Sequence, residues 1–576
     1  MRLSKAASLV FVAIGILFLG GCSFLDDTVY PVASDSADLA SQSLNDWTIE
    51  DSSLNGAPLV EDKTVYDQDD PSEVTTFYVT LYPTVDDNGD TVTFQDFNKV
   101  SRDDLNYNPT LNVLIQEGDD TGLKQDGLGY LDTAANAAMR VRGYSSRNAV
   151  MKSYKIVFYE STGEWKKQTT LNLNKHYSDP TKVAQKFSMD MISRLDNIAS
   201  LRTQFVHLYI RDLTSEVLNA GFVDYGLYTN TEQPNKAYLK SRGLDESGSL
   251  YKAVHFSFRE DSALVNTDDE DYDKDAFEAI LGIREGKDHS KLLQMLKDVN
   301  DYNQDFNTVF AKYFNKDNYL TWMAVNFLVG NEDTVSHNFM LYNPSNSMTW
   351  YFLPWDYDGT FRFGTMTTSV AVPDSMYGVP RYWSVVLHRR FLENPDNVTA
   401  LMQKLDEVHQ VLNSTATQEL VDKYKNVLRQ FMVKEPDLSA SRLPPNEIEP
   451  YLDQFSSYID NNYQRVIASL QYPMPVYTAE PERAQNGSVR FAWEASYDLQ
   501  GQLLTYDFTL AKDPDMKDVV FSEKDYIGTE ITVDNLPAGT YYQKLMINDE
   551  EGHSQYCAES FRNGQTYFGV RQFVIN

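Results

Sequence analysis

The order of its strand-like and helix-like patterns is the feature that most limits how this chain can fold. From residue 73 to about 230, β-branched and aromatic residues alternate with polar ones, which is typical of strands. Later segments, such as "DNYLTWMAVNFLVG" (317–330) and "NVTALMQKLDEVHQVL" (397–412), carry apolar residues at helical spacing. Strands that come first and helices that dominate later predict an α+β domain over residues 73–470.

After residue 473 the chain returns to short strand patterns. These segments are separated by turns that contain Gly, Pro and Asn, and one of them, "VRFAWEA" (489–495), carries Trp493 as a core-type residue. We therefore predict a second domain over residues 473–576, a β-sandwich that resembles fibronectin type III domains.

The first residues, "MRLSKAASLVFVAIGILFLGGC", have the layout of an export signal: a basic start, an apolar run and small residues. The apolar run is shorter than the roughly 20 residues that a membrane-spanning helix needs. Residues 1–21 resemble a bacterial lipoprotein signal, which implies a lipid on Cys22 and a cell-surface protein anchored to the membrane. A plain cleavable signal is the alternative. Residues 22–72 are rich in Asp, Ser and Thr without a period, which predicts an acidic flexible tether.

Charge and cysteine content exclude two classes of function. The formal net charge of -33 at pH 7 repels phosphate backbones, so we expect no nucleic-acid partner. If Cys22 carries a lipid, only Cys557 remains, so neither an internal disulfide nor a cysteine-based zinc site is expected.

Acidic and amide side chains lie on both sides of a predicted hairpin. A loop that holds Asp333 and Asn338 begins after the helix pattern that ends at Gly330. Two strand-like segments follow, "NFMLYN" and "TWYFLP", joined by the turn residues "PSNS", and then come Asp356 and Asp358 in "PWDYD".

The expected register of this hairpin brings the four polar residues to its open end. A turn centred between Ser345 and Asn346 would place Asn338 opposite Leu353 and would direct Asp333 towards Asp358. All four polar side chains should then meet at one edge.

This arrangement has the layout of a phosphoryl-transfer site. In protein kinases an Asp is followed five residues later by an Asn, then by a further Asp that binds magnesium. Asp333, Asn338 and Asp356 follow that order, and carboxylate and amide oxygens are the ligands that Mg²⁺ prefers. Asp356 also has apolar neighbours, among which a bare carboxylate would be costly. We predict Asp333 as the catalytic residue; a merely solvated acidic loop is the alternative.

Five segments, in this order along residues 75–470, resemble the CotH spore-coat kinase family. They are "MRVRGYSSRNAVMKSYKI", "GLYTNTEQ", "LYKA", "FLVGNEDTVSHNFMLY" and "FLPWDYDGTF". The resemblance implies an atypical protein-kinase-like domain of two lobes. It also implies that ATP and Mg²⁺ (or Mn²⁺) are used to phosphorylate Ser or Thr of proteins.

The resemblance assigns roles to individual residues. It supports Asp333 as the catalytic residue, Asn338 and Asp356 as metal ligands, and Asp358 as a further metal-binding residue. The residues that it implies for nucleotide binding are Arg142, Gly143, Ser145, Ser146, Lys152, Lys155 and Glu232. Among these, Gly143 with the two serines resembles a phosphate-facing turn, and the role of Glu232 stays open between ordering the lysine and contacting the nucleotide.

Lys152 and Lys155 cannot both contact one phosphate, because residues three apart in a regular strand point to opposite faces. We expect Lys152 to make the contact, since Lys155 lies nearer the middle of the strand and could pair with an acid. Arg140 and Arg142 share one face of the preceding strand and could add charge.

The sequence therefore predicts a lipid-anchored protein kinase outside the cytoplasm that acts on surface or secreted proteins. Two alternatives remain. One is a surface-binding or scaffold protein with a kinase-like body that has lost transfer activity. The other is an enzyme that binds ATP but transfers the nucleotide part rather than the phosphate.

Overall fold

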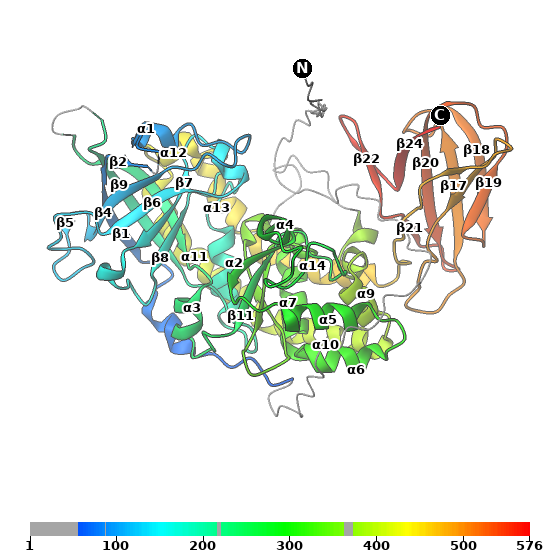
Figure 1. Ribbon diagram of the computed structural model, residues 1–576, viewed down its shortest axis with the longest axis horizontal. Coiled ribbons are helices and arrows are strands. Elements are labelled where there is room, and N and C mark those ends of the chain that lie inside the picture. The colour runs from blue at the N-terminus through cyan, green and yellow to red at the C-terminus, as the bar shows by residue number, and fades with distance from the viewer. Residues whose placement is uncertain (1–55, 87, 216–219, 362–372, 576) are drawn as a thin grey trace, which may run out of the picture.

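The structure is a computed structural model that describes residues 56–86, 88–215, 220–361 and 373–575. The predicted signal peptide, Cys22 and most of the predicted tether lie outside the described residues. The described chain forms a β-lobe, an α-lobe and a C-terminal sandwich, in that order (Figure 1). The prediction of a mixed α+β protein with β-sheets at its C-terminus is confirmed.

The β-lobe is built on one sheet of eight strands in the order β1-β9-β10-β8-β7-β6-β4-β5. Strand β1 also pairs with β4, so the sheet closes on itself, and only the β1–β9 pairing is parallel among those described in this sheet. The strands are β1 (Val74–Tyr82), β4 (Thr110–Asp119), β5 (Gly122–Leu123), β6 (Ala137–Arg142), β7 (Ser153–Phe158), β8 (Thr170–Asn174), β9 (Thr203–Asp212) and β10 (Val223–Thr231).

Alternation along the strands decides which residues fill this sheet and which lie outside it. Met139 and Val141 of β6 and Ile156 of β7 belong to the apolar core that the sheet encloses. Because successive side chains in a strand point to opposite faces, Arg140, Arg142 and Lys155 lie on the outer face. The short elements of this lobe are β2 (Thr84–Val85), β3 (Thr91–Val92), α1 (Phe94–Phe97), η2 (Ser145–Asn148) and η3 (Glu160–Thr162).

The α-lobe packs helices around a sheet of four strands in the order β12-β11-β13-β14. The strands are β11 (Ser249–Ala253), β12 (Leu281–Glu285), β13 (Phe339–Asn343) and β14 (Tyr351–Pro354). The helices are α3 (Lys236–Ser241), α4 (Lys274–Ile280), α5 (Ser290–Asn300), α6 (Phe306–Tyr313), α7 (Lys316–Val329), α8 (Val379–Tyr382), α9 (Val386–Leu392), α10 (Pro395–Val411) and α14 (Phe455–Ser469), with the turns η4 (Glu332–Thr334), η5 (Tyr357–Gly359) and η7 (Asp374–Met376). Three more helices, α11 (Ser414–Phe431), α12 (Asp437–Ala440) and α13 (Pro445–Leu452), extend from this lobe and lie beside the β-lobe, where α12 contacts β10 (Figure 1).

Helix α7 is the centre of the α-lobe. Nearly all of its residues are buried, the Asn315 side chain accepts a hydrogen bond from the Asn318 N–H (2.8 Å), and the helix ends at Gly330 with φ of 65°, as predicted. Helix α2 (Ala184–Ile192) connects β8 to β9 and packs against η5, where the Ser188 and Thr360 hydroxyls lie 3.0 Å apart.

The C-terminal sandwich consists of antiparallel sheets around a separate apolar core. One sheet holds β15 (Glu482–Arg483), β16 (Val489–Ala492) and β19 (Glu530–Val533), and the other holds β17 (Thr505–Ala511), β18 (Val519–Tyr526), β20 (Gly539–Asn548), β21 (Ser554–Tyr556) and β24 (Val570–Ile575), with a hairpin of β22 (Ser560–Arg562) and β23 (Thr566–Phe568). Trp493 stacks on Phe508 inside this core, with ring centroids 5.7 Å apart, and Cys557 is buried there. The likeness to fibronectin type III domains stays a prediction.

Residues 56–73, called the strap here, belong to the folded body although the sequence predicted tether up to residue 72. At its start the strap contacts the α-lobe: the Gly56 N–H donates to Thr349 Oγ1 (2.7 Å) and the Tyr351 hydroxyl donates to the Ala57 carbonyl (2.8 Å). Its turn η1 (Lys63–Gln68) leads to Asp69, which accepts two hydrogen bonds from the buried Arg202 (2.6 and 3.1 Å). Polar contacts and the burial of Leu59 and Val65 therefore hold the strap against the folded body.

In the part of the chain that the structure describes, no helix combines the length and the apolar character that crossing a membrane requires.

Candidate active site

The loop between α7 and β13 carries Asp333 and Asn338, as the sequence predicted. After Gly330 the Asn331 N–H donates to the Asn326 carbonyl (2.9 Å), and the Thr334 hydroxyl donates to the Asn331 carbonyl (3.0 Å). These bonds close the turn η4, which contains Asp333. The Asn338 N–H donates to the Ala253 carbonyl (3.2 Å), which fixes the other end of the loop at the end of β11.

The hairpin exists, but its register differs by two residues from the expected one. Phe339 pairs with Pro354, so Asn338 lies beside Trp355 rather than Leu353. The connection is longer than the four residues "PSNS", because the Trp350 N–H donates to the Tyr313 carbonyl (2.7 Å) and β14 begins only at Tyr351. A shift of two residues keeps every side chain on its face of the sheet, so Asn338 and Asp356 still lie at the open end.

Two of the predicted metal ligands have unusual backbone conformations. Asn338 has φ of 59° and Asp356 has φ of 61°, in the left-handed region that residues other than glycine rarely adopt. Such conformations cost on the order of 1–3 kcal/mol each and persist where the surrounding structure fixes them. Both residues are therefore held in place at the end of the hairpin.

Positive side chains from both lobes lie near Asp356. Burial lowers the pKa of Arg142, on β6, and the nearby carboxylates of Asp356 and Asp358 oppose that shift. Burial also lowers the pKa of Lys252, on β11, where Asp356 again opposes the shift and Arg284 and Arg142 add to it. Arg142 and Lys252 therefore approach one carboxylate from different lobes.

Lys155, on β7, extends this group of cations. Burial, and then the charges of Arg140, Arg142 and Arg284, lower the pKa of Lys155 to about 8. Within the described residues, the side chains of Arg142, Lys155 and Lys252 make no ion pair and no hydrogen bond. The chain has 83 Asp and Glu residues against 50 Lys and Arg. Despite this excess of acidic residues, Arg142, Lys155 and Lys252 form no ion pair with any residue that the structure describes, and they repel one another. Unpaired cations gathered in this way are typical of a site for a multiply charged anion.

Residues 139–466, more than half of the chain, match the family described as CotH kinase protein. The chain belongs to the CotH kinase family. The description of this family names a kinase.

Two known proteins are similar to parts of this CotH-family chain. The inner spore coat protein H of Bacillus subtilis (strain 168) is 27% identical over 225 residues, which are 38% of this chain and 57% of that protein. The chain thus spans little more than half the length of this curated relative. The crystal structure of the Helicobacter pylori proinflammatory kinase CtkA matches with 10% identity and a TM-score of 0.23, and the match covers 58% of this chain and 93% of that one.

Of the two lysines expected in the CotH-family site, Lys155 lies in the charged cluster and Lys152 does not. The buried amine of Lys152 donates to the Val100 carbonyl (3.1 Å) and to the Arg147 carbonyl. Lys152 therefore supports the loop after β6, on the opposite side of the strand. The expectation that Lys152 contacts phosphate stays a prediction, but its amine is already bonded to two backbone carbonyls, whereas Lys155 lies among the other cations.

The predicted phosphate-facing turn adjoins Arg142. Gly143 has φ of 88°, and a Cβ at this position would lie 2.0 Å from Ser146 Oγ, so only glycine fits. Ser146 in turn donates to the Arg142 carbonyl (3.3 Å), and Ser145 is exposed. The turn places hydroxyl groups beside the charged cluster; their contact with phosphate stays a prediction.

Glu232 pairs with an arginine and not with the lysine that the sequence led us to consider. Its buried carboxylate accepts hydrogen bonds from the Arg242 guanidinium (3.1 and 2.7 Å) and from the Arg202 N–H (3.0 Å). Glu232 thus fixes the connection between β10 and α3, residues 232–235, called the lobe connection below.

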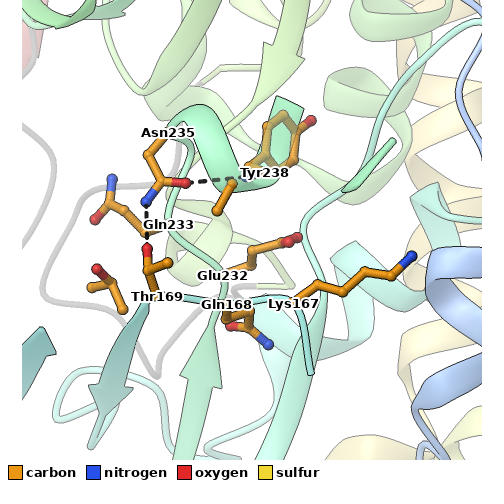
Figure 2. Close-up of a pocket in the computed structure, with 9 residues that line it drawn as sticks. Lys167, Gln168, Thr169, Glu232, Gln233, Asn235 and Tyr238 are labelled. Atoms are coloured by element: carbon orange, nitrogen blue, oxygen red, sulfur yellow. Dashed lines mark hydrogen bonds between the residues drawn. The ribbon is translucent and has the colours of Figure 1, made fainter. Parts of the chain in front are cut away.

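A shallow depression lies at the lobe connection. Figure 2 shows Asn235 there, between the Thr169 hydroxyl (3.4 Å) and the Tyr238 N–H (3.1 Å). The depression has no room for a water molecule, and its lining includes Gln168, Thr170, Glu232 and Gln233. It is therefore a surface feature of the lobe connection and not a preformed cavity.

Four charged or titratable residues near the acids or the cations were not predicted as part of the site. Lys252 stands in "LYKA", one of the motifs of the resemblance, so this motif was a usable signal. Arg284 lies on β12 beside Gly282, where a Cβ would come within 3.1 Å of its guanidinium. His176 and His337 are the other two. Burial lowers the pKa of both imidazoles, to about 4 for His176, and Asp356 and Asp333 respectively counteract this.

The site fits a divalent cation that binds together with phosphate. Across the described ranges, no three His, Cys, Asp or Glu side chains come together as a metal site. Mg²⁺ usually takes only one or two protein carboxylates and completes its shell with water and phosphate oxygens. Asp356 and Asn338 offer such hard oxygens, and neither side chain has a hydrogen-bond partner among the described residues.

Proposed function

We propose that this chain is a protein kinase that transfers the γ-phosphate of ATP to Ser or Thr of surface or secreted proteins. We further propose that Mg²⁺ or Mn²⁺ assists and that a lipid on Cys22 anchors the protein at the cell surface. The observation that carries the proposal is the group of cations from both lobes, of which Arg142 and Lys252 lie near Asp356 and Lys155 lies near Arg142. An anion with several charges would relieve their repulsion.

The register of the strands supports one orientation of ATP along β7, with its base and its phosphates at opposite ends of the strand. Along β7, Ser153 pairs with Arg142 near the acids, Lys155 pairs with Arg140, and Val157 pairs with Thr170 at the lobe connection. Four residues of strand span about 13 Å, a length on the scale of a nucleoside triphosphate. A base near the lobe connection would place the terminal phosphate at Asp356. This direction favours phosphoryl transfer over nucleotidyl transfer.

Each polar group would have a defined task in such a reaction. Asp333 would accept the proton of the attacking hydroxyl at its carboxylate. Arg142, Lys155 and Lys252 would bind phosphate oxygens. Asn338 and Asp356 would hold the divalent cation, with Asp358 next to them. When bound, the cation would neutralise charge on the phosphates.

The decisive experiment uses residues 23–576 with ATP labelled at either the γ- or the α-phosphate, Mg²⁺ or Mn²⁺, and dephosphorylated casein as the acceptor. We expect γ-label on serine or threonine of casein or of the chain itself. Asp333→Asn should lower kcat by about 10²–10⁴-fold, the usual contribution of a general base, with ATP affinity preserved. Binding of ATP without transfer would favour the scaffold alternative. Label from the α-phosphate alone would indicate nucleotidyl transfer.

The affinity for ATP should depend on pH through Lys155. With a pKa of about 8 in the free protein, this amine is charged below pH 8 and loses its charge above it. The affinity should therefore fall only about twofold between pH 7 and 8 and by up to about tenfold per pH unit above pH 8. Titration calorimetry with ATP measures this. Lys155→Arg, which stays charged, should show no such decline; a decline of equal size in Lys155→Arg would contradict the assignment.

A further inference from the structure

The C-terminal sandwich is docked on the α-lobe by specific contacts. Figure 1 shows β21 on the side of the sandwich nearest the helices. Between the two parts, Trp383 stacks on Tyr497 with centroids 5.4 Å apart, and the Tyr497 hydroxyl donates to the Glu393 carbonyl (2.9 Å). Arg389 pairs with Glu494 across the same boundary (3.2 Å). These contacts fix the position of the sandwich on the α-lobe.

One contact of the sandwich reaches a segment that follows the acidic turn η5 in the sequence. Gln555 of β21 is completely buried, and its amide donates to the Ser375 carbonyl in η7 and to the Pro473 carbonyl (3.2 Å). Its own amide oxygen accepts from the Tyr556 N–H (3.0 Å), so the side chain is fixed in orientation. The sandwich thus supplies η7 with a donor that lies outside residues 139–466, the region that matches the family.

From η7, contacts continue to the loop that holds Asp333. Tyr377, directly after η7, donates from its hydroxyl to the Phe327 carbonyl near the end of α7 (2.6 Å). Tyr382 of α8 follows five residues later, and its hydroxyl lies 2.9 Å from Thr334 Oγ1. Thr334 is the neighbour of Asp333 in η4. Tyr377 therefore holds the last turn of α7, after which the Asp333 loop begins, and Tyr382 contacts the loop itself at Thr334.

We propose that the sandwich contributes to the activity of the kinase and that Gln555 is a positioning residue for Asp333. By holding η7, Gln555 fixes the chain from which Tyr377 and Tyr382 support the Asp333 loop. A donor in the sandwich thereby determines how firmly the loop keeps its geometry. The role in catalysis rests on the proposed function; the role in ordering the loop does not.

The test compares Gln555→Leu, which keeps the volume and removes the donor, with Gln572→Leu on β24. Gln572 is exposed, and its amide contacts only the Tyr542 hydroxyl (3.0 Å). In residues 23–576, Gln555→Leu should lower kcat about tenfold and change the KM for ATP less than twofold. Gln572→Leu should match the parent chain. An equal loss in the two variants, or a parallel rise in the KM for ATP, would overturn the proposal.

Amide hydrogen exchange gives a second readout that needs no activity. Residues 374–382 and 331–336 should exchange at least fivefold faster in Gln555→Leu, whereas the strands of the β-lobe should be unchanged. Tyr377→Phe, which removes one hydroxyl and keeps the ring, should act in the same direction if Gln555→Leu fails to fold. Unchanged exchange in these segments would overturn the positioning role even if the parent chain transfers phosphate. Faster exchange with no transfer by the parent chain would refute the kinase function alone.

Discussion

Replacing Asp356 by Asn should reduce phosphoryl transfer by about 10²–10³-fold, the range found when a group that stabilises developing charge is removed. The substitution keeps the shape of the side chain and removes one negative charge between Arg142 and Lys252. The site would lose its charged ligand for a divalent cation and keep its cations. Metal-free ATP should therefore bind at least as tightly as before, and Mg²⁺ should no longer improve binding.

Calorimetric titrations of ATP with and without Mg²⁺, together with transfer of γ-label, measure the two effects. Asp453→Asn is the matched control, since Asp453 is an exposed carboxylate on the same lobe that pairs with Lys425. It should leave transfer and binding unchanged. If Asp356→Asn kept its response to Mg²⁺, the assignment of Asp356 as a metal ligand would be wrong.

Removing two cations at once should give the largest loss of nucleotide affinity. In Lys155→Met with Lys252→Met we expect affinity for ATP to fall by about 10²-fold or more, because hydrogen bonds to charged groups contribute about 1.5–3 kcal/mol each. The same change should raise the melting temperature of the free protein, since it removes repulsion between Lys155, Lys252 and the neighbouring arginines. Loss of affinity with a gain in stability is the signature of a preformed anion site.

Lys152→Met is the control for the double variant. The Lys152 amine donates to two backbone carbonyls, so its removal should lower the melting temperature and change ATP affinity less than threefold. Thermal unfolding and calorimetry distinguish the three proteins. A large loss of affinity in Lys152→Met, with none in the double variant, would restore Lys152 as the phosphate contact.

The local part of the site could be predicted from the sequence. The order of Asp333, Asn338, hairpin and Asp356 depends on neighbouring residues, and the helix end at Gly330 follows from its left-handed conformation. The register of the hairpin could not be predicted in the same way. A hydrogen bond from Trp350 to Tyr313, on another element, lengthens the connection and moves the pairing by two residues.

The rest of the site depends on contacts between segments far apart in the chain. Arg142 and Lys252 come from strands in two different sheets, and no periodicity indicates that these strands face one carboxylate. The choice between Lys152 and Lys155 required knowing which side of β7 faces the α-lobe. The strap could not be predicted because a few polar contacts and two isolated apolar residues, Leu59 and Val65, hold it, and acidic polar segments carry no signal that separates docked chain from free chain.

The strap also sets an order of events while the protein is made. Gly56 and Ala57 contact Thr349 and Tyr351, partners that lie 293 and 294 residues further along the chain. At about 5–20 residues per second, synthesis reaches those partners roughly 15–60 s after Gly56 has been added. The earliest described residues are thus among the last that can reach their final positions. They can bind only to an α-lobe that has already folded.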